Sequence, residues 1–418
     1  MHDFAARLYP ICRSITGPGV RQTLGLLGHR LPGLRLHEVP TGTQCFDWIV
    51  PEEWSIESAH LTGPDGERIV DFADHNLHVV SYSIPVDAEF SLDELQPHLH
   101  SRPDRPDAIP YVTSYYRRDW GFCLPHRQRE ALKPGRYRAV IRSRLAPGSL
   151  SYADLVLPGR SREEILLSTY ICHPSMGNNE LSGPVVTAQI AQWLMRLDRR
   201  YTYRIVFVPE TIGAIVYLSR HLEEMRGWVI AGLQITCIGD DRSYSYLASR
   251  RGDTLADRAA RHALSQVAPG YAAYDFAQRG SDERQYCAPG VDLPVCSIMR
   301  TKYGAYPEYH SSDDDLSLIT PAGLAGGYTA VRRWIESLEV NATYRAVMLG
   351  EPQLIRHGLR PAVSDGQLGT FHKSVSDILA FSDGETDLLA IAERTRIPVW
   401  DLAPIAAQLV SAGLLARL

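Results

Sequence analysis

The chain has 418 residues, of which 44% are hydrophobic and 22% charged, and its formal net charge is −5. This composition is typical of a globular protein with ample core, and the length suits two or three domains. The acidic balance argues against a polyanionic partner, because nucleic-acid binding draws most of its affinity from Lys and Arg side chains that neutralise phosphates. We therefore predict a small peptide or amide substrate and no nucleic-acid partner.

The cysteines and the N-terminus bear on the cellular compartment. The seven cysteines include no Cys-x-x-Cys pair, and their odd number leaves at least one unpaired. The first residues lack a basic stretch followed by a long apolar run, and no window of about 18 apolar residues occurs in the chain. The sequence thus predicts reduced thiols, a cytoplasmic location and no membrane partner.

Elements of different kinds follow one another along the chain. An amphipathic helix is expected at about 19–31, and from about 45 to 124 short period-two runs broken by Pro and Gly turns indicate a small all-β insert. From about 137, beginning with YRAVIRS, apolar runs alternate with amphipathic helices. That alternation predicts an α/β fold with a mainly parallel sheet covered by helices on both faces. The expected helices span 182–198, 211–225, 252–267 and 320–338.

The residues beyond about 343 form a separate module. Three short helices and a terminal strand follow one another in the order of a winged helix-turn-helix. The third helix, 398–412, contains no Lys or Arg, which a helix that reads the major groove needs. We expect this module to serve docking or homo-oligomer formation, with DNA binding as the less favoured alternative. The predicted domains are an α/β domain (1–45 and 120–342), a β insert (46–119) and the winged helix (343–418).

Side chains that can bind a metal follow the predicted strands. His173 ends an apolar run within CHPSMGNNELSG, which also contains Glu180. Glu210 follows the next run in VFVPETIG, and His310 lies in YHSSDDDLSLIT. Because ligands of parallel sheets bind at the carboxyl ends of the strands, these loops are expected to meet at one edge. A lone histidine at a strand end is usually a satisfied polar residue, so it is the combination that indicates a metal site.

The motifs YPICRSITG, ICHPSMGNNELSGP, PETIG, GDDRSYSYL and SDERQYC carry a resemblance to known proteins. From about 130 to 340 the chain resembles the zinc aminopeptidases. Over its whole length it resembles a bacterial family of aminopeptidase-like proteins with a nested β domain of unknown function and a C-terminal winged helix. The resemblance implies that His173 and His310 are metal ligands and that Glu210 is the general base.

Three positions depart from the paired-zinc pattern of those aminopeptidases. The turn reads Asn179-Glu180, which shifts the carboxylate by one residue, and Thr211 and Thr236 stand where the pattern has acids. Each zinc of the pair would therefore lose one carboxylate. The remaining set of two histidines and one glutamate suits a single catalytic zinc with an open position for water.

We expect His173, Glu180 and His310 to bind one zinc ion per chain. Glu180 is favoured over Asn179, because a zinc ion on two neutral imidazoles gains more from an anion than from an amide. Zinc would activate a water molecule and polarise the scissile carbonyl, while Glu210 moves the proton to the leaving amine. The candidate substrate-binding residues, for each of which a solvated or structural role is the alternative, are Asp241, Arg242, Asp282, Arg284 and Tyr309.

These observations predict a zinc-dependent hydrolase of peptide-like bonds, expected to be an aminopeptidase for short substrates. Two alternatives stay open. One is a single-zinc enzyme of other amide chemistry, such as a deacylase or a cyclising transferase. The other is a non-catalytic binding or regulatory protein that contains the metal.

Overall fold

An eight-stranded sheet is the framework of the larger part of the computed structural model, which describes residues 1–359 and 367–418. Its strands are β1 (Arg35–Pro40), β10 (Ser149–Leu157), β11 (Glu164–Tyr170), β12 (Thr202–Val208), β13 (Val229–Gln234), β14 (Ser245–Leu247), β15 (Ala272–Tyr274) and β16 (Val295–Met299). The strand order is β1-β10-β12-β11-β13-β16-β14-β15. The central strands β12, β11, β13 and β16 are parallel, whereas β10 and β14 join them antiparallel. All central strands therefore end at the same edge.

The burial of β11 explains why its segment forms a central strand. All seven of its residues are buried, which is the pattern of a strand covered on both faces. Its one charged residue, Glu164, accepts two hydrogen bonds from Arg204 of β12, at 2.6 and 2.9 Å. A buried carboxylate is tolerated in such a place because its charge is paired and hydrogen-bonded.

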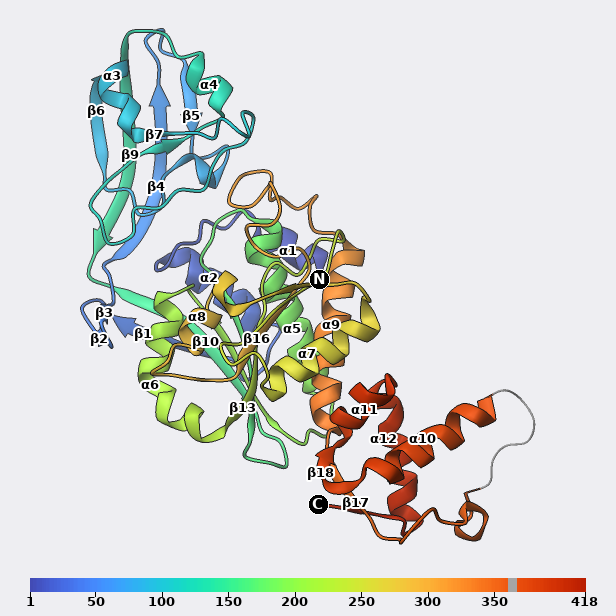
Figure 1. Ribbon diagram of the computed structural model, residues 1–418. Coiled ribbons are helices and arrows are strands. Elements are labelled where there is room, and N and C mark those ends of the chain that lie inside the picture. The colour runs from blue at the N-terminus through green and yellow to red at the C-terminus, as the bar shows by residue number, and fades with distance from the viewer. Residues whose placement is uncertain (360–366) are drawn as a thin grey trace. The chain divides into compact units, whose positions relative to one another are not determined.

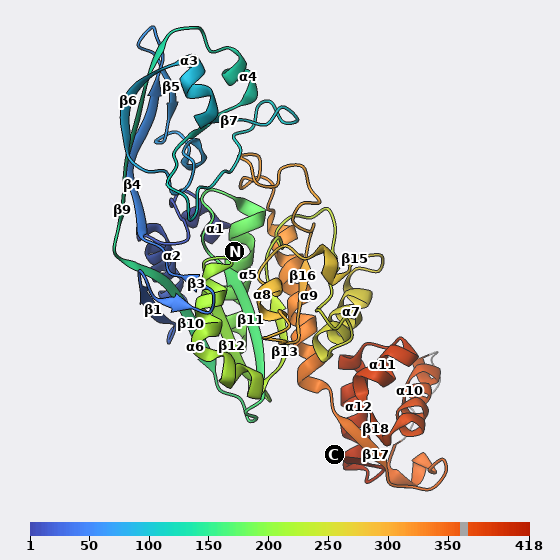
Figure 2. The same cartoon turned by 60° about the vertical axis from the view of Figure 1, so that its left-hand side comes forward.

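Helices cover both faces of this sheet (Figures 1 and 2). Helix α5 (Ser182–Leu194) connects β11 to β12, and α6 (Ile212–Trp228) connects β12 to β13. Since β12 and β13 lie on opposite sides of β11, the two crossovers run in opposite directions. Right-handed connections then place α5 and α6 on opposite faces. The predicted α/β fold class is confirmed.

A four-stranded antiparallel sheet, with β4 (Glu53–Thr62), β5 (Arg68–Asp71), β6 (Val86–Ser91) and β9 (Arg136–Ala146), forms the β insert. Strand β9 pairs with both β4 and β6. Figures 1 and 2 show β4 and β9 side by side as they leave the α/β sheet. The segment 137–143, which the sequence predicted as the first strand of the α/β alternation, thus belongs to the insert. An apolar run alone does not specify which sheet a strand joins.

Shorter elements complete this part of the chain. Two small two-stranded sheets pair β2 (Gln44–Cys45) with β3 (Trp48–Ile49) antiparallel, and β7 (Leu99–His100) with β8 (Phe122–Cys123) in parallel. The helices are α1 (His2–Leu8), α2 (Pro18–Gly28), α3 (Leu92–Leu95), α4 (His126–Glu130) and α8 (Glu283–Tyr286). The chain divides into two compact units, one of residues 1–256 and 272–328 and the other of residues 257–271 and 329–418. No helix in the described ranges is long and apolar enough to cross a membrane.

The smaller unit contains the predicted winged helix. Its elements include most of α7 (Leu255–Val267), the end of α9 (Pro321–Val340), α10 (Gln367–Phe381), α11 (Leu388–Thr395) and α12 (Val399–Ser411). A sheet of order β18-β17-β19 joins β17 (Thr343–Ala346), β18 (Asp383–Asp387) and β19 (Leu415–Arg417). Strands β17 and β18 were not expected from the sequence, because their few residues are half-exposed and show no apolar run.

Asp387 caps α11 and offers a test of what stabilises this unit. Its carboxylate accepts hydrogen bonds from Ala390 N at 2.7 Å and from Arg258 at 2.8 and 3.0 Å. Asp387→Ala is expected to lower the free energy of unfolding of this unit by about 1–2 kcal/mol, because the cap is lost and Arg258 keeps only Glu393 as an ion-pair partner among the described residues. Urea unfolding measures the change. The exposed neighbour Glu385→Ala is the control, and equal midpoints for the two variants would contradict the expectation.

Helix α12 has no Lys or Arg, and this absence leads to a second prediction. Mixed-sequence duplex DNA should show no mobility shift with the full chain at physiological salt, because α12 has no Lys or Arg to neutralise phosphates in the groove. A salt-sensitive, submicromolar shift would overturn the docking assignment of this module.

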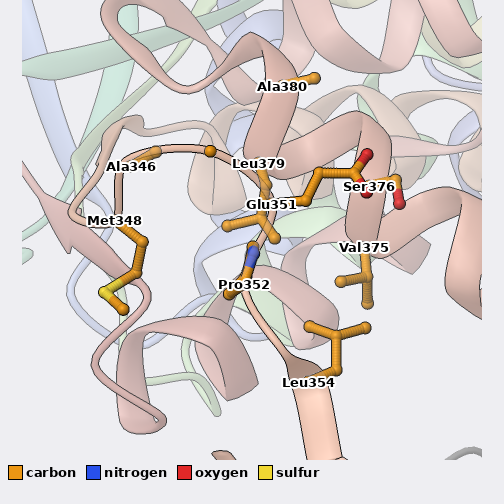
Figure 3. Close-up of a pocket in the computed structure, with 10 residues that line it drawn as sticks. Ala346, Met348, Glu351, Pro352, Leu354, Val375, Ser376, Leu379 and Ala380 are labelled. Atoms are coloured by element: carbon orange, nitrogen blue, oxygen red, sulfur yellow. The ribbon is translucent and has the colours of Figure 1, made fainter.

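The smaller unit also has a pocket between the segment after β17 and helix α10 (Figure 3). Its lining residues include Ala346, Met348, Glu351, Pro352, Leu354, Val375, Ser376, Leu379 and Ala380. Among the described lining residues there is no histidine or cysteine. This pocket therefore lacks the nitrogen and sulfur ligands of a zinc site.

Candidate metal centre and pocket

Three loops at the carboxyl edge of the sheet bring two histidines and a glutamate together. His173 follows β11, Glu210 follows β12, and His310 lies in the long connection after β16. His173 Nε2 is 3.5 Å from Glu210 Oε2. The ring centroids of His173 and His310 are 5.5 Å apart. The parallel strands thus deliver side chains from distant parts of the sequence to one place.

A π-helical turn, Gly177–Leu181, shapes the chain between His173 and α5. Asp314 holds this turn, because its carboxylate accepts hydrogen bonds from Asn178 N and, at 2.9 Å, from Asn179 N. The same carboxylate accepts a hydrogen bond from the Tyr306 hydroxyl at 2.9 Å. Single π turns are rare and are frequent at functional sites.

Glu180 lies beside the Nδ1 atom of His173. Its Oε2 is 2.8 Å from His173 Nδ1, and its Oε1 is 3.7 Å from Arg13 Nε. Burial raises the pKa of Glu180 to about 8, and the Arg13 guanidinium opposes this rise. Glu180 and Glu210 therefore lie on opposite nitrogens of one imidazole, Glu180 at Nδ1 and Glu210 at Nε2.

Arg13 is a buried cation next to this pair that sequence reasoning missed. It is fully buried and donates hydrogen bonds from Nε to the His173 carbonyl at 3.1 Å and from Nη1 to the Leu8 carbonyl at 2.6 Å. The signal available was a lone arginine within the motif YPICRSITG. Its charge balances Glu180, because a buried carboxylate needs a charged or hydrogen-bonding partner.

Both histidines are held in the neutral form that metal binding requires. Burial, together with the nearby Arg13 charge, lowers the pKa of His173 to about 3. Burial and the neighbouring His173 lower the pKa of His310 to about 3 as well. A neutral imidazole has a free lone pair for a cation. His310 Nε2 is buried and has no hydrogen-bond partner within the described residues.

The loops at this site carry buried atoms of the kind that bind metal ions. Asn179 Oδ1 and Glu180 Oε1, like His310 Nε2, are buried acceptors that lack a hydrogen-bond partner in the described part of the chain. Thr236, which stands where the paired pattern has an acid, donates from its hydroxyl to the Asn179 carbonyl at 3.0 Å. The ligand atoms of Cys172, His173 and Glu180 lie within 4.8 Å of one another. A cation at that cluster would face the adjacent Arg13 charge, so the Nε2 side of His173 is the better place.

The backbone after Glu210 is strained. Thr211 has φ 64° and ψ −77°, which is unfavourable for a β-branched residue. Asp282 Oδ1 accepts a hydrogen bond from Thr211 N at 2.7 Å, and Arg284 donates to the Thr211 hydroxyl at 2.5 Å. These contacts hold the turn that aims Glu210 across the strand ends. Burial raises the pKa of Glu210 to about 7, although the charge of Arg284 opposes the rise.

The five predicted substrate-binding residues take different places. Arg284 lines the pocket beside the histidines. Asp282 is buried beneath Thr211, where it supports the strained turn. The ring of Tyr309 stacks on that of His310, with centroids 3.9 Å apart. Tyr309 thus touches a candidate ligand directly.

Asp241 and Arg242 are exposed, and they make other contacts in the structure. Asp241 accepts a hydrogen bond from the Thr320 hydroxyl at 3.0 Å. Arg242 donates two hydrogen bonds to Glu308, at 2.9 and 3.0 Å. Neither residue belongs to the described pocket lining, so a role in substrate binding stays a prediction for both.

A pocket of about 310 Å³ lies at the two histidines. Its aromatic wall, defined here as Trp48, Tyr111, Tyr115 and Tyr116, comes from β3 and from the loop between β7 and β8. The Tyr111 ring makes edge contacts with both histidine rings, at centroid distances of 5.0 and 5.2 Å. Sequence reasoning missed this wall because the contributing loops have no periodic pattern that would show which way they face.

The sheet and the site together define an aminopeptidase-like α/β protein. The zinc aminopeptidase BSAP from Bacillus subtilis superposes with a TM-score of 0.60 at 11% identity, over 81% of this chain and 93% of that one. An aminopeptidase from Aneurinibacillus sp. strain AM-1 superposes with a TM-score of 0.53 at 12% identity, over 80% and 92% of the two chains. At these identities the likeness concerns the fold.

Closer relatives show the family. A Clostridium acetobutylicum protein, provisionally named a polysaccharide biosynthesis protein with an aminopeptidase-like domain, is 42% identical over 397 residues, covering 94% of this chain and 91% of that protein. The crystal structure of a provisionally named peptidase from the same species has a TM-score of 0.94 at 40% identity, over 100% and 96% of the chains. The family described as a domain of unknown function (DUF4910) matches residues 2–341, and a winged helix-turn-helix family matches 342–417. The chain belongs to the DUF4910 family, and the resemblance seen in the sequence is confirmed.

Proposed function

We propose that this protein is a zinc-dependent hydrolase of short peptide-like amides. The observation that carries the proposal is the meeting of His173 Nε2, the unpartnered His310 Nε2 and Glu210 in one pocket. Two neutral imidazoles and a nearby carboxylate are what a catalytic zinc site with an open water position uses. The similarity in fold to zinc aminopeptidases supports the same chemistry.

The histidines would hold zinc through their Nε2 atoms. Glu180, expected from the sequence as the third ligand, lies on Nδ1 of His173, and we propose that it orients the ring and supplies negative charge through it. Asn179, the alternative that the sequence left open, keeps a buried Oδ1 with no partner among the described residues, and because Glu180 lies on the Nδ1 side we propose Asn179 as the third donor. Arg13 would favour the ionised form of Glu180 and hold its side chain in place.

Glu210 would move the proton in the reaction. When bound, zinc would polarise the scissile carbonyl and lower the pKa of a water molecule. Glu210 would take the proton of that water and deliver it to the leaving nitrogen. The strained Thr211 turn keeps its carboxylate aimed at the histidines, and the aromatic wall lines the same pocket.

Metal analysis of the purified full-length chain and a substrate panel test this proposal. About one zinc ion per chain is expected, since only one complete ligand set survives the two threonine replacements. The panel compares short peptides with free amines, N-acyl amino acids and simple amides, before and after chelation and with zinc restored. Two tightly held metal ions would contradict the single-zinc site. Bound zinc with no turnover of any panel member would instead favour the binding or regulatory alternative.

A further inference from the structure

The two charged side chains that line the pocket differ in how freely they could bind a ligand. Among the described lining residues, Glu210 is the one carboxylate and Arg284 the one permanent cation. The Arg284 side chain is exposed, and its guanidinium donates a hydrogen bond to the Thr211 hydroxyl. Within the described ranges it forms no ion pair with a carboxylate. Most of its donors therefore remain available to an anion.

A free α-amine would find no dedicated partner here. The carboxylates behind the pocket make other contacts, since Asp282 binds Thr211 N, Asp314 binds the π turn, and Glu283 accepts from Gly280 N at 2.9 Å, and none of these three belongs to the described pocket lining. Among the described lining residues Glu210 is the one carboxylate, and an ammonium group bound to it would compete with its work as a base. The charges thus suit a substrate whose amine is acylated.

The aromatic wall suits the acyl part of such a substrate. Trp48 and Tyr116 remain 37% and 53% exposed, and their rings meet edge to face with centroids 5.4 Å apart. Exposed aromatic groups at the mouth of a pocket are typical of a ligand-binding surface. Flat apolar groups gain most from such rings, because aromatic pairs favour edge-to-face and offset contacts.

We propose that the pocket takes N-acylated amino acids, with the substrate carboxylate on Arg284 and the acyl group on the aromatic wall. Arg284 touches the residue that follows Glu210, so the carboxylate would lie next to the scissile amide on its leaving-group side. Planar guanidinium groups bind carboxylates through two parallel hydrogen bonds. The inference rests on the proposed hydrolase function and names its substrate class.

The reaction consumes one water molecule. The water oxygen forms a bond with the acyl carbon, and the bond between that carbon and the amide nitrogen breaks. Glu210 takes the water proton and passes it to the leaving nitrogen. The products are the carboxylate of the acyl group and the free amino acid, so no oxidant, reductant or co-reactant is needed.

Equilibrium binding to the full-length protein tests the recognition step without turnover. The probe is 3-benzoylpropionate, in which CH₂ replaces the amide NH of N-benzoylglycine, and its primary amide is the neutral comparison. Calorimetry on the unaltered protein should give a dissociation constant about tenfold to a hundredfold lower for the carboxylate, the usual effect of a charge-assisted hydrogen bond. A second comparison ligand is L-phenylalaninamide, which carries a free amine and should bind more weakly than the carboxylate.

Variants then test whether the preference for the carboxylate ligand depends on the Arg284 side chain. Arg284→Gln should remove most of the preference for carboxylate over amide, and Arg284→Lys should keep part of it because the charge remains. The control is Arg226→Gln, an exposed arginine on α6 outside the described pocket lining, which should keep the full preference. Equal binding of carboxylate and amide by the unaltered protein, or a full preference in Arg284→Gln, would overturn the inference.

A hydrolysis assay distinguishes a failure of this inference from a failure of the proposed function. Release of benzoate from N-benzoylglycine, followed by chromatography, would support both. A carboxylate preference in binding with no hydrolysis of any panel amide would refute the hydrolase and support the anion site. Hydrolysis of free-amine peptides with no carboxylate preference would refute the inference and support an aminopeptidase.

Discussion

Replacing Glu210 with glutamine is expected to lower kcat by about a hundredfold or more, which is the usual scale for loss of a general base. The amide has nearly the shape of the carboxylate but cannot take a proton from water. The backbone contacts that hold the turn, from Glu210 N to Cys172 Sγ at 3.2 Å and from Thr211 N to Asp282, do not involve the replaced group. Zinc content should therefore stay near that of the unaltered protein. Steady-state kinetics and metal analysis on one preparation measure both quantities.

Glu180→Gln is the matched comparison, because it makes the same change on the other nitrogen of His173. It should weaken zinc retention by about tenfold to a hundredfold, since a carboxylate that accepts from a ligand imidazole raises its basicity and fixes its orientation. It also leaves Arg13 without its ion-pair partner. Loss of zinc in Glu210→Gln with retention in Glu180→Gln would mean that the two glutamates have exchanged roles.

Removal of either histidine should empty the metal site. His310→Ala and His173→Ala are each expected to reduce zinc from about one ion per chain to almost none after dialysis, because the two remaining donors bind zinc poorly. Hydrolytic activity should disappear with the metal. Elemental analysis of the dialysed variants, with circular dichroism to compare their fold, measures the effect.

His29→Ala is the control for these two variants. His29 is exposed at the end of α2, so its loss changes the histidine count without touching the site. Full zinc retention in His310→Ala would show that His310 is not a ligand, and the buried, unpartnered Nε2 would then need another explanation.

The positions of the candidate ligands could be predicted because they follow local patterns. His173 and Glu210 each come directly after an apolar run. The end of such a run marks the end of a strand, and this holds even when the neighbouring strands in the sheet are not known. Parallel strands share one carboxyl edge, so the approximate meeting place of their loops follows from the fold class. His310 follows the same rule less closely, because a longer loop separates it from β16.

Contacts between distant loops could not be predicted in this way. Arg13 and the Glu180 carboxylate are joined by tertiary packing of α1 and the π turn, and no spacing in the sequence specifies it. The sheet that β9 joins likewise depends on its pairing with β4 and β6. The side of His173 on which Glu180 lies is decided by a single π turn, which has no sequence signature of its own.

The loop that supplies Tyr111 is joined to the backbone around His310. Tyr111 N donates to the His310 carbonyl at 2.9 Å, Ser312 N donates to the Ile109 carbonyl at 2.8 Å, and Pro110 forms a bridge with Ser311. His310 itself is in the left-handed region at φ 57°, a conformation that this pairing helps to hold. Shortening this loop would therefore disturb the backbone that carries His310 as well as the aromatic wall, so a truncated insert is expected to change the metal site and the pocket together.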